Sequence, residues 1–405
     1  MSALTPINEA FSKLLVTLEK VDESELIPAL DCVGRILAED LISTVDVPPH
    51  TNSAMDGYAL SSADLEQSST ILKVSQRIAA GEMGTKLSKG EAARIFTGAP
   101  IPEGSDAVVM QENCEVNGGK IKVLQNVNSG ENLREAGEDV KSGKILLVAG
   151  HRLLPQDIGL AASTGAAFLN VKRKLRVAVM TTGDELVSPG TKLKPGQIYN
   201  SNFYSLASLL GQLGCDVVET GIMADDFEAT KKALEEEAKN VDCIISTGGV
   251  SVGEEDHIKP AVEAIGHLDL WKLAIKPGKP FASGKVEGTQ FFGLPGNPVS
   301  TFITFLLLVK PFLLSMLGCQ EVQIRRGYPI AADFESVKSG ERQEYIRVNL
   351  ERDRTGKLCM KPFANQSSGV GTSLNFTEGL AVVPPYTGVS KGDALEYIPF
   401  SELLG

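Results

Sequence analysis

Residues 241–260 read VDCIISTGGVSVGEEDHIKP. A short apolar run leads into a glycine-rich turn, and three acids follow at Glu254, Glu255 and Asp256. A glycine-rich turn after a strand is typical of a phosphate cradle, because its exposed backbone N–H groups can hold an oxyanion. Carboxylates beside a phosphate are consistent with that function if a metal ion bridges the two kinds of group.

The turn matches neither of the two common nucleotide-binding motifs. No GxxxxGK[ST] sequence occurs, and the spacing of Gly248, Gly249 and Gly253 excludes GxGxxG. Taken alone, the turn therefore favours neither a purely structural function nor a binding function over the other.

Short apolar strands alternate with helices on both sides of this turn. LRVAVM (175–180) and QFFGL (290–294) are the other compact apolar runs. One helix is expected after Asn200 or Ser201, and another after the pair Asp225-Asp226. This alternation predicts a parallel sheet that is covered by helices on both faces.

Three turns of this segment follow predicted strands: TTGDEL (181–186), STGGVSVGEED (246–256) and LPGNP (294–298). Ligands of open parallel sheets bind beyond the carboxyl ends of the strands, so the three turns predict one site. Acids gather at these strand ends and helix starts: Asp184, Glu185, Asp225, Asp226, Glu254, Glu255 and Asp256. Each acid alone is explained as a helix cap or a solvated residue, but the group favours a magnesium ion that also binds phosphate.

Residues 271–286 read WKLAIKPGKPFASGKV and carry Lys272, Lys276, Lys279 and Lys285 without an acid. The whole chain has a net charge of −12, so this cluster is a local exception. Clustered lysines raise the local concentration of anions. The alternative is a solvated strand edge whose lysines prevent aggregation.

The remaining segments predict further units. Residues 4–40 look helical, with LLVTLEKV (14–21) and VGRILAEDL (33–41) as the main runs. Residues 70–148 look like strands joined by Gly- and Asn-rich turns, and residues 151–166 predict a helix. EYIRVNLE (344–351) alternates apolar and polar residues and predicts a small β domain from about residue 326 onward.

Composition limits the class of protein. A chain of 405 residues suggests two to four domains, and its acidic balance argues against nucleic-acid binding. Six scattered cysteines indicate buried thiols in a reducing compartment, and the N-terminus shows no signal peptide. The apolar run 299–317 contains Lys310-Pro311, so we expect a buried helix bent at Pro311 in a cytoplasmic protein.

The ordered set of motifs resembles the molybdopterin molybdenumtransferase family (MoeA) from about residue 5 to the C-terminus. The motifs are NSAMDGYA (52–59), FTGAPIPEGSDAVV (96–109), LREAGEDV (133–140), TTGDEL, IYNSN (198–202), STGGVSVGEEDH (246–257), KLAIKPGKP (272–280) and GLPGNPVS (293–300). One departure is PPHT before the first motif, where His50 and Thr51 replace the aromatic residue and the acid that are more usual in the family.

The resemblance implies a fold of several domains. These are a composite linker and dimerisation domain (1–50 and 137–173), an inserted β-rich domain (51–136), a three-layer α/β/α MogA-like molybdopterin-binding domain (174–325), and a C-terminal β-barrel-like domain (326–405). The implied assembly is an elongated homodimer with its site in a cleft between the subunits.

The implied reaction inserts molybdenum from molybdate into adenylylated molybdopterin, with Mg²⁺ as divalent metal, hydrolysis of the adenylyl group and release of AMP. The implied partners are a MogA-type adenylyltransferase and downstream maturation proteins of molybdoenzymes, with no nucleic acid and no membrane.

The resemblance also implies particular site residues. The catalytic residues would be Asp56, Thr97, Asp139, Glu185, Asp225 (with Asp226 as the close alternative) and Asp256. Glu185, Asp225 and Asp256 would hold the metal. The substrate-binding residues would be Arg134, Thr247, Gly248, Gly249, Ser251, Lys272, Lys276, Lys279, Pro295, Pro298, Arg347 and Ser368.

Two alternatives are open at this stage. A non-catalytic molybdopterin-binding or scaffold protein, as in the receptor-anchoring relative gephyrin, would share the α/β domain. An unrelated magnesium-dependent nucleotide hydrolase could use the same glycine-rich turn, but it would not need the motifs around Asp56 and Thr97.

Overall fold

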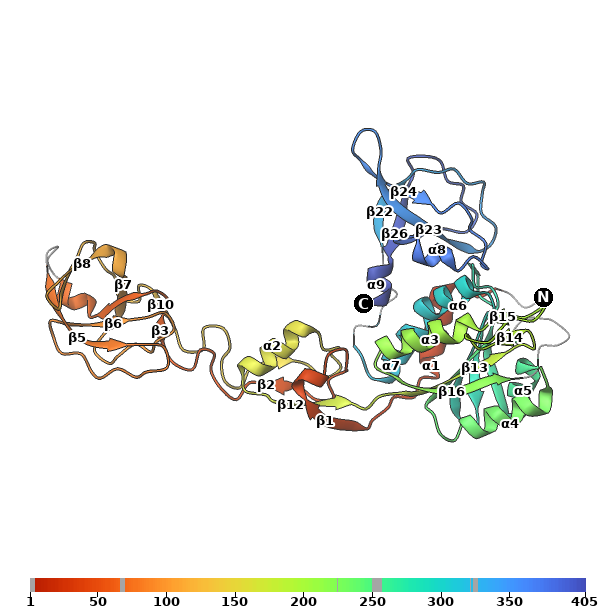
Figure 1. Ribbon diagram of the computed structural model, residues 1–405, viewed down its shortest axis with the longest axis horizontal. Helices are drawn as coiled ribbons and strands as arrows, with labels where there is room; N and C mark the ends of the chain where they lie inside the picture. Colours follow the sequence, from red (N-terminus) through yellow and green to blue (C-terminus); the bar gives the residue numbers. More distant parts are fainter. Residues whose placement is uncertain (1–3, 66–69, 224, 250–256, 321, 323–326) are drawn as a thin grey trace.

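The computed structural model describes residues 4–65, 70–223, 225–249, 257–320, 322 and 327–405. The chain is elongated, with an α/β unit at one end, a β-sheet unit at the other and a small unit between them (Figure 1). A C-terminal β unit lies beside the α/β unit. The predicted site residues Ser251 and Asp256, with Glu254 and Glu255, lie outside the described residues.

In the described part of the α/β unit, six strands pair in the order β16-β13-β17-β21-β20-β18. Their bounds are β13 Arg176–Thr182, β16 Asp216–Met223, β17 Cys243–Thr247, β18 Gly266–Trp271, β20 Ala282–Val286 and β21 Thr289–Leu294. The first four strands of this order are parallel, as predicted, whereas β20 runs antiparallel to both of its neighbours, β21 and β18. Only Glu287 and Gly288 join β20 to β21, both with positive φ, and so short a connection allows only an antiparallel hairpin.

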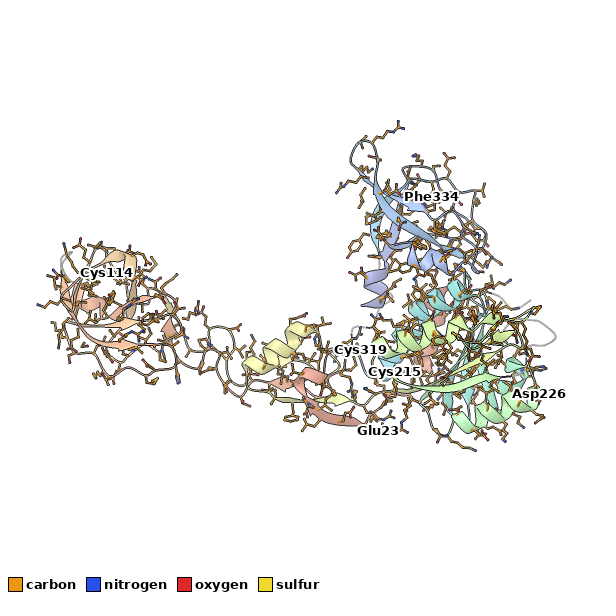
Figure 2. All side chains as sticks on the ribbon, viewed as in Figure 1. Glu23, Cys114, Cys215, Asp226, Cys319 and Phe334 are labelled. Atoms are coloured by element: carbon orange, nitrogen blue, oxygen red, sulfur yellow. The ribbon has the colours of Figure 1, made fainter. Side chains whose placement is uncertain are left out.

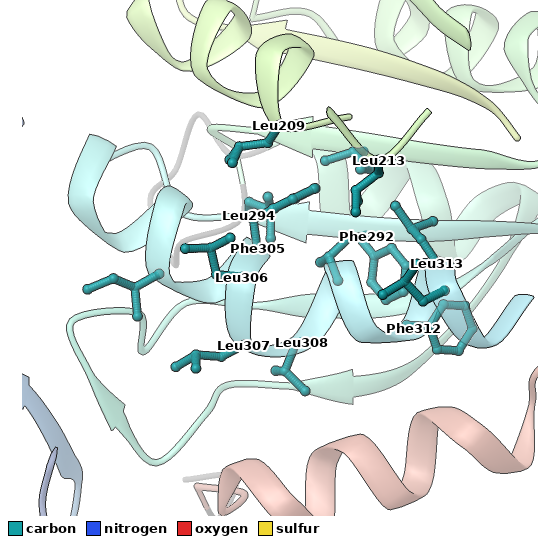
Figure 3. Close-up of a cluster of buried hydrophobic side chains, with 14 of the residues drawn as sticks. Leu209, Leu213, Phe292, Leu294, Phe305, Leu306, Leu307, Leu308, Phe312 and Leu313 are labelled. Atoms are coloured by element: carbon teal, nitrogen blue, oxygen red, sulfur yellow. The ribbon is translucent and has the colours of Figure 1, made fainter. Parts of the chain in front are cut away.

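Helices cover both faces of this sheet, as the alternation predicted. The helices are α1 Ile7–Val16, α3 Ser201–Gln212, α4 Phe227–Glu237, α5 Ile258–Ile265, α6 Pro298–Thr304 and α7 Lys310–Met316. Residues of α1, α3, α6 and α7 pack with Val177 and Phe292, whereas those of α4 and α5 pack with Ala178 and Phe291. Alternate residues of each strand thus enter opposite cores, which gives three layers. Figure 3 shows the larger core, where Phe292, Phe305 and Phe312 meet leucines of α3 and α7.

The apolar run forms a core helix. Pro298–Met316 is long and apolar enough to cross a membrane, yet 94% of its most apolar window is buried inside the protein. Its irregularity lies one turn before Pro311, where Phe305–Val309 is π-helical. Proline cannot donate to the helical ladder and its ring crowds the carbonyl four residues earlier, so the preceding turn widens.

The middle unit combines two distant segments. Strand β1 Ser24–Pro28 pairs with β12 Phe168–Lys172, and β2 Leu41–Ile42 pairs with β11 Ile145–Leu147, beside α2 Pro155–Ser163 and the 3-10 turn η1 Ala29–Asp31. The helix expected over residues 33–41 is wrong. Ile36 and Leu37 instead bridge to Arg152 and Val171, because Gly34 adopts a φ of 83° and donates its N–H to the Leu153 carbonyl. Tertiary pairing here overrides local propensity.

The distal β unit, which we call the tip sheet, forms the far end of the molecule. Its described strands pair in the order β7-β4-β6-β5-β9-β8. Their bounds are β4 Gly57–Leu60, β5 Ile71–Ile78, β6 Glu91–Ile95, β7 Ala107–Met110, β8 Cys114–Asn117 and β9 Lys120–Val123, with 3-10 turns η2 Ser62–Leu65 and η3 Gln111–Asn113. Beside them β3 Asn52–Ser53 pairs with β10 Leu133–Arg134. These pairings support the predicted domain boundaries, which stay a prediction.

The C-terminal unit is a small barrel. Its strands are β22 Tyr328–Ala332, β23 Gln343–Arg352, β24 Leu358–Pro362, β25 Gly379–Val383 and β26 Ala394–Pro399, with helices α8 Thr372–Asn375 and α9 Phe400–Leu404. Pairing of β23 with β25 closes the sheet. The barrel is joined to the α/β unit because β19 Ile275–Lys276 pairs with β23.

All six cysteines are free thiols, and Figure 2 places Cys114 in the tip sheet, at the opposite end of the molecule from Cys215 and Cys319. Burial raises the pKa of Cys215 to about 12 and that of Cys114 to about 11. These thiols are therefore protonated near neutral pH and poor nucleophiles.

Candidate ligand-binding site

A cavity of about 700 Å³ lies at the carboxyl ends of β13, β17 and β21. The predicted residues Glu185, Thr247, Gly248, Gly249, Pro295 and Pro298 line it. Its wall also includes β15 Ile198–Tyr199, which pairs with β14 Leu186–Val187, and the first turn of α3. The three turns that the sequence assigned to one site therefore meet there.

The glycines of the turn after β17 have a steric reason. Gly248 and Gly249 have φ values of 92° and 63°, a region that favours glycine. A Cβ added at Gly248 would lie 2.8 Å from the Thr182 carbonyl oxygen, and one at Gly249 would lie 2.7 Å from Ile258 Cγ1. Any other residue at either position would push the turn away from β13 and change the cavity wall.

Thr182, at the end of β13, is a site residue that sequence reasoning missed. Its side chain is 8% exposed and lines the cavity, and its Oγ1 has no hydrogen-bond partner among the described residues. A buried hydroxyl without a partner is costly, so this atom suits a ligand that supplies one. The signal in the sequence was the TTGDEL turn, where only Glu185 was chosen.

Asn202 was also missed, although IYNSN was noted as a motif. Its Nδ2 donates to Thr247 Oγ1 at 2.9 Å and to the Gly296 carbonyl at 2.7 Å. Asn200 caps α3 by accepting from the Phe203 N–H at 3.3 Å, which confirms one of the two predicted caps. Asn202 therefore joins the turn after β17 to the PGNP turn after β21.

The described acids divide between two functions. Asp226 caps α4, since its Oδ1 accepts the Ala229 N–H at 2.8 Å, and this favours Asp225 over Asp226 as the site acid. Asp184 Oδ1 accepts the Asp225 N–H at 3.3 Å, which links the turn after β13 to the turn after β16. The Glu185 side chain lies close over Gly183, where an added Cβ would be 2.6 Å from Oε2.

These acids allow a limited metal site. The described residues contain no group of three or more His, Cys, Asp or Glu side chains that could enclose an ion. Mg²⁺ needs only one or two carboxylates when water and substrate phosphates complete its shell. Glu185 with Asp225 therefore fits an ion that arrives with a phosphate-bearing substrate, and does not fit a closed protein cage.

A loop of the barrel completes the cavity wall. Gly369 lines the cavity, and the neighbouring Ser368 carbonyl accepts the Val299 N–H of α6 at 3.1 Å. This carbonyl caps the helix, because Asn297 at the N-cap position makes no side-chain capping bond. The α6 helix is thus held to the C-terminal unit at the site.

Arg347 on β23 holds the same loop from below. Its side chain is 1% exposed, Nε donates to Ser373 Oγ at 3.0 Å, and Nη2 donates to the Ser367 carbonyl at 3.1 Å. Burial lowers the pKa of Arg347 to about 10. Its observed contacts position the loop, and direct contact with substrate stays a prediction.

The lysine cluster separates in three dimensions. Lys272, Lys276 and Lys279 belong to one turn, closed by the Leu273 N–H bond to the Lys279 carbonyl, and Pro280 of this turn lines the cavity. Lys276 pairs with Glu344 at 3.2 Å, so part of the positive charge of the cluster is balanced by an acid from outside residues 271–286. Lys285 lies elsewhere, on β20, where it pairs with Glu19.

The predicted residues of the tip sheet lie at the opposite end of the chain from the cavity (Figure 1). Asp56 Oδ1 accepts both the Thr97 N–H and the Thr97 hydroxyl at 2.8 Å, and these bonds lower the pKa of Asp56. Arg134 and Asp139 are exposed. Within one chain the structure brings Asp56 to Thr97 but brings neither residue to Glu185.

One departure from the family pattern has a visible function. Thr51 Oγ1 accepts the Ala136 N–H at 3.3 Å, and the Thr51 carbonyl accepts the Ile101 N–H at 3.0 Å. Thr51 therefore links the loop before Asp56 to the segment that carries Arg134 and Asp139.

Fold and site together define a multidomain protein whose α/β unit has a cavity at the carboxyl ends of parallel strands. Residues 5–165 match the MoeA N-terminal region (domain I and II), residues 178–315 match a probable molybdopterin binding domain, and residues 332–400 match the MoeA C-terminal region (domain IV).

Whole-chain relatives agree. The chain is 37% identical over 401 residues to a molybdopterin molybdenumtransferase of Haemophilus influenzae, covering 98% of this chain and 99% of the relative. It is 32% identical to a Bacillus subtilis protein of the same name, covering 98% and 94%. The crystal structure of a molybdopterin biosynthesis moeA protein from Pyrococcus horikoshii superposes with a TM-score of 0.84 at 30% identity, covering 98% and 99%.

The chain therefore belongs to the molybdopterin molybdenumtransferase family. It is a transferase of molybdenum cofactor biosynthesis, which confirms the resemblance inferred from the motifs.

Proposed function

We propose that this chain inserts molybdenum from molybdate into adenylylated molybdopterin in the cytoplasm, with Mg²⁺-dependent hydrolysis of the adenylyl group and release of AMP. The observation that carries the proposal is the 700 Å³ cavity, where a glycine turn, a buried hydroxyl without a partner and a carboxylate share one wall. Backbone N–H groups and a hydroxyl suit a phosphate, whereas a carboxylate suits a metal or an attacking water.

Each residue would act where the chain places it. Thr247, Gly248, Gly249 and Ser251 would hold the pterin phosphate, and Pro295 and Pro298 would shape the facing turn. Lys272, Lys276 and Lys279 would hold molybdate or phosphate beside it, and Arg347 and Ser368 would contribute to substrate binding from the C-terminal β domain. Glu185, Asp225 and Asp256 would hold Mg²⁺, which when bound neutralises charge on phosphoryl oxygens.

A second copy of the chain would complete the site. Asp56 before β4, Thr97 after β6 and Arg134 on β10 lie too far along the molecule to reach the cavity of their own chain (Figure 1). A homodimer in which each tip sheet reaches the other subunit's cavity would bring them together, because a two-fold axis makes such an exchange reciprocal. A MogA-type adenylyltransferase would supply the substrate, and molybdoenzyme maturation proteins would accept the product.

The test is AMP release from adenylylated molybdopterin by the purified chain in magnesium buffer, with and without molybdate. We expect release that requires molybdate and is lost in Asp56→Ala and Glu185→Ala. Glu236→Ala is the matched control, because Glu236 is an exposed acid on α4 whose partner is Lys232. Tight pterin binding without release would support the scaffold alternative, and release that ignores molybdate would support the hydrolase alternative.

A further inference from the structure

Two arginines face each other on neighbouring strands of the tip sheet. Arg77 of β5 is the register partner of Arg94 of β6. Both guanidinium groups stack on Phe96, with their central carbons 4.4 Å and 4.6 Å from the ring centroid. Like charges directly opposite each other destabilise a sheet, so sheet stability alone does not explain this pair.

Neither arginine forms an ion pair within the part of the chain that the structure describes. Arg94 donates to the Gly57 carbonyl at 2.9 Å and to Gln111 Oε1 at 2.6 Å, both of which are neutral acceptors. Among the described residues, Arg77 makes neither a hydrogen bond nor an ion pair, although it is exposed. Lys73, on the same strand, does pair with an acid, Glu91, at 3.3 Å. The stacked arginines are therefore held in place with unused donors.

The arginines adjoin the predicted catalytic residues of the tip sheet. Phe96 immediately precedes Thr97, and Arg94 bonds the carbonyl of Gly57, the residue after Asp56. The Thr97 N–H and hydroxyl lower the pKa of Asp56 most, and the charge of Arg94 lowers it further. One face of the tip therefore presents two guanidinium groups and an ionised carboxylate together.

The cavity lacks what this face offers. None of the described residues that line the cavity is Lys or Arg, and Glu185 is its one charged lining residue. Beyond the proposed Mg²⁺ and the lysine turn that adjoins the cavity through Pro280, further cations would favour a phosphoanhydride there in a chain of net charge −12. Guanidinium groups offer paired donors to phosphate oxygens and a flat face to a nucleobase, which lysines do not.

We infer that Arg77 and Arg94, stacked on Phe96, form a binding surface for the adenosine monophosphate half of the substrate, presented to the cavity of a second copy. The inference rests on the proposed function, since it takes the substrate to be adenylylated. The phosphate binds the guanidinium donors, and the base stacks on the exposed face of Arg77.

The test measures AMP binding to the full chain by titration calorimetry. We expect Arg77→Ala to weaken AMP affinity about tenfold, as for loss of one charge-assisted hydrogen bond. Arg77→Lys keeps the charge but loses the planar fork, so its AMP affinity lies between those of wild type and Arg77→Ala. Lys73→Ala is the control, because it removes a positive charge from the same strand and leaves AMP affinity unchanged. Arg77→Ala breaks no hydrogen bond among the described residues, so an unchanged unfolding temperature verifies its fold.

Several outcomes decide the matter. AMP affinity of Arg77→Ala within about twofold of wild type overturns the inference, because the lost bond is then worth less than about 0.4 kcal/mol. Weaker self-association with unchanged AMP affinity also overturns it, and assigns the arginines to acids of the second copy. If wild type binds AMP through Arg77 but releases none from adenylylated molybdopterin, the proposed reaction fails while the nucleotide surface stands.

Discussion

Among single residues, Thr182 is one whose substitution should affect the stability of the protein and its substrate binding in opposite directions. Its hydroxyl is buried at the cavity wall without a partner among the described residues. Valine has nearly the same shape and no polar atom, so Thr182→Val removes a desolvation cost in the free protein. We expect its free energy of unfolding to stay equal or rise by about 1 kcal/mol.

The same change should weaken substrate binding. A ligand phosphate that bonds Thr182 Oγ1 loses one neutral hydrogen bond, so we expect the KM for adenylylated molybdopterin to rise about fivefold. Thr230→Val is the matched control, because Thr230 on α4 is also buried with an unpartnered Oγ1 but does not line the cavity. Equal KM values for Thr182→Val and wild type would contradict a ligand contact at this hydroxyl.

Asp56 and Thr97 give a prediction about pH. The Thr97 N–H and hydroxyl both bond the carboxylate, and these bonds lower the pKa of Asp56 because they stabilise its ionised form. Thr97→Val keeps the N–H bond but removes the hydroxyl bond, so the pKa of Asp56 rises. If ionised Asp56 is needed, the acidic limb of the kcat/KM profile moves to higher pH. An acidic limb that stays in place would show that another group controls it.

Sequence motifs identified those site residues whose function can be inferred from residue type and spacing alone. Glu185, Gly248, Gly249 and Pro298 were placed at one site because turns after parallel strands converge. Thr182 and Asn202 were missed because hydrogen bonding in the folded chain determines their importance. Thr182 Oγ1 is buried without a partner among the described residues, and Asn202 bonds two different turns. Lys285 was grouped wrongly with the other lysines, because it lies at the far end of β20 from their turn, where it pairs with Glu19.

At the scale of elements, the link between β12 and β13 joins the middle unit to the α/β unit, and Arg173 in this link is fixed to Asp242 before β17. Arg173 Nη1 and Nη2 bond the two carboxylate oxygens at 2.7 Å and 2.8 Å, and the Arg176 N–H bonds Oδ2 at 2.8 Å. Burial raises the pKa of Asp242, but these bonds outweigh it, so the pKa is lowered overall. The clamp is therefore strongest when Asp242 is ionised.

We expect Asp242→Asn to lower the free energy of unfolding by about 1–2 kcal/mol at pH 7, a value reduced for partial solvent exposure. The folded-state pKa lies below the unfolded one, so this stability is fully present above the unfolded pKa of about 3.9 and is lost as pH falls through the folded pKa. Urea unfolding curves of both proteins should therefore converge at low pH. A difference that stays constant with pH would mean that the charge is irrelevant.

Prediction of helices and strands failed where residues far away in the sequence determine the local conformation. The periodicity of residues 33–41 suited a helix, but pairing with residues 151–153 and 171 made the segment extended. The parallel sheet was predicted for β13, β17 and β21, and these strands are parallel, whereas β20 runs antiparallel to β21 because a two-residue turn joins them. Strong local patterns, such as the core helix from Pro298 to Met316, were read correctly since burial reinforces them.

At the scale of the whole molecule, elongation decides which residues can act together. The tip sheet and the cavity lie at opposite ends of the molecule (Figure 1). Local sequence patterns could not predict this distance between them. The motifs could be assigned to a common reaction only through the family resemblance. Because these residues are far apart within one chain, a shared site requires two chains, as in the proposed homodimer.

That answer predicts complementation between inactive variants. Asp56→Ala lacks the tip carboxylate and Glu185→Ala lacks the cavity carboxylate, so each homodimer would have two defective sites. When the two variants are unfolded, mixed in equal amounts and refolded, half of the dimers are mixed. Each mixed dimer contains one intact site, formed by the Asp56 and the Glu185 that remain. We therefore expect about a quarter of wild-type AMP release from such a mixture, given random pairing about a two-fold axis.

The control is a mixture of Asp56→Ala with Thr97→Ala. Both changes lie on the tip, yet each chain keeps one of the two residues, so no subunit of a mixed dimer presents an intact pair. This mixture should stay as inactive as its components, which separates restored sites from a general effect of refolding. Recovered activity in the first mixture and none in the second requires that a site is built from two chains. No recovery in the first mixture, with dimers present by sedimentation, would mean that each chain builds its site alone and that its tip must bend back to its own cavity.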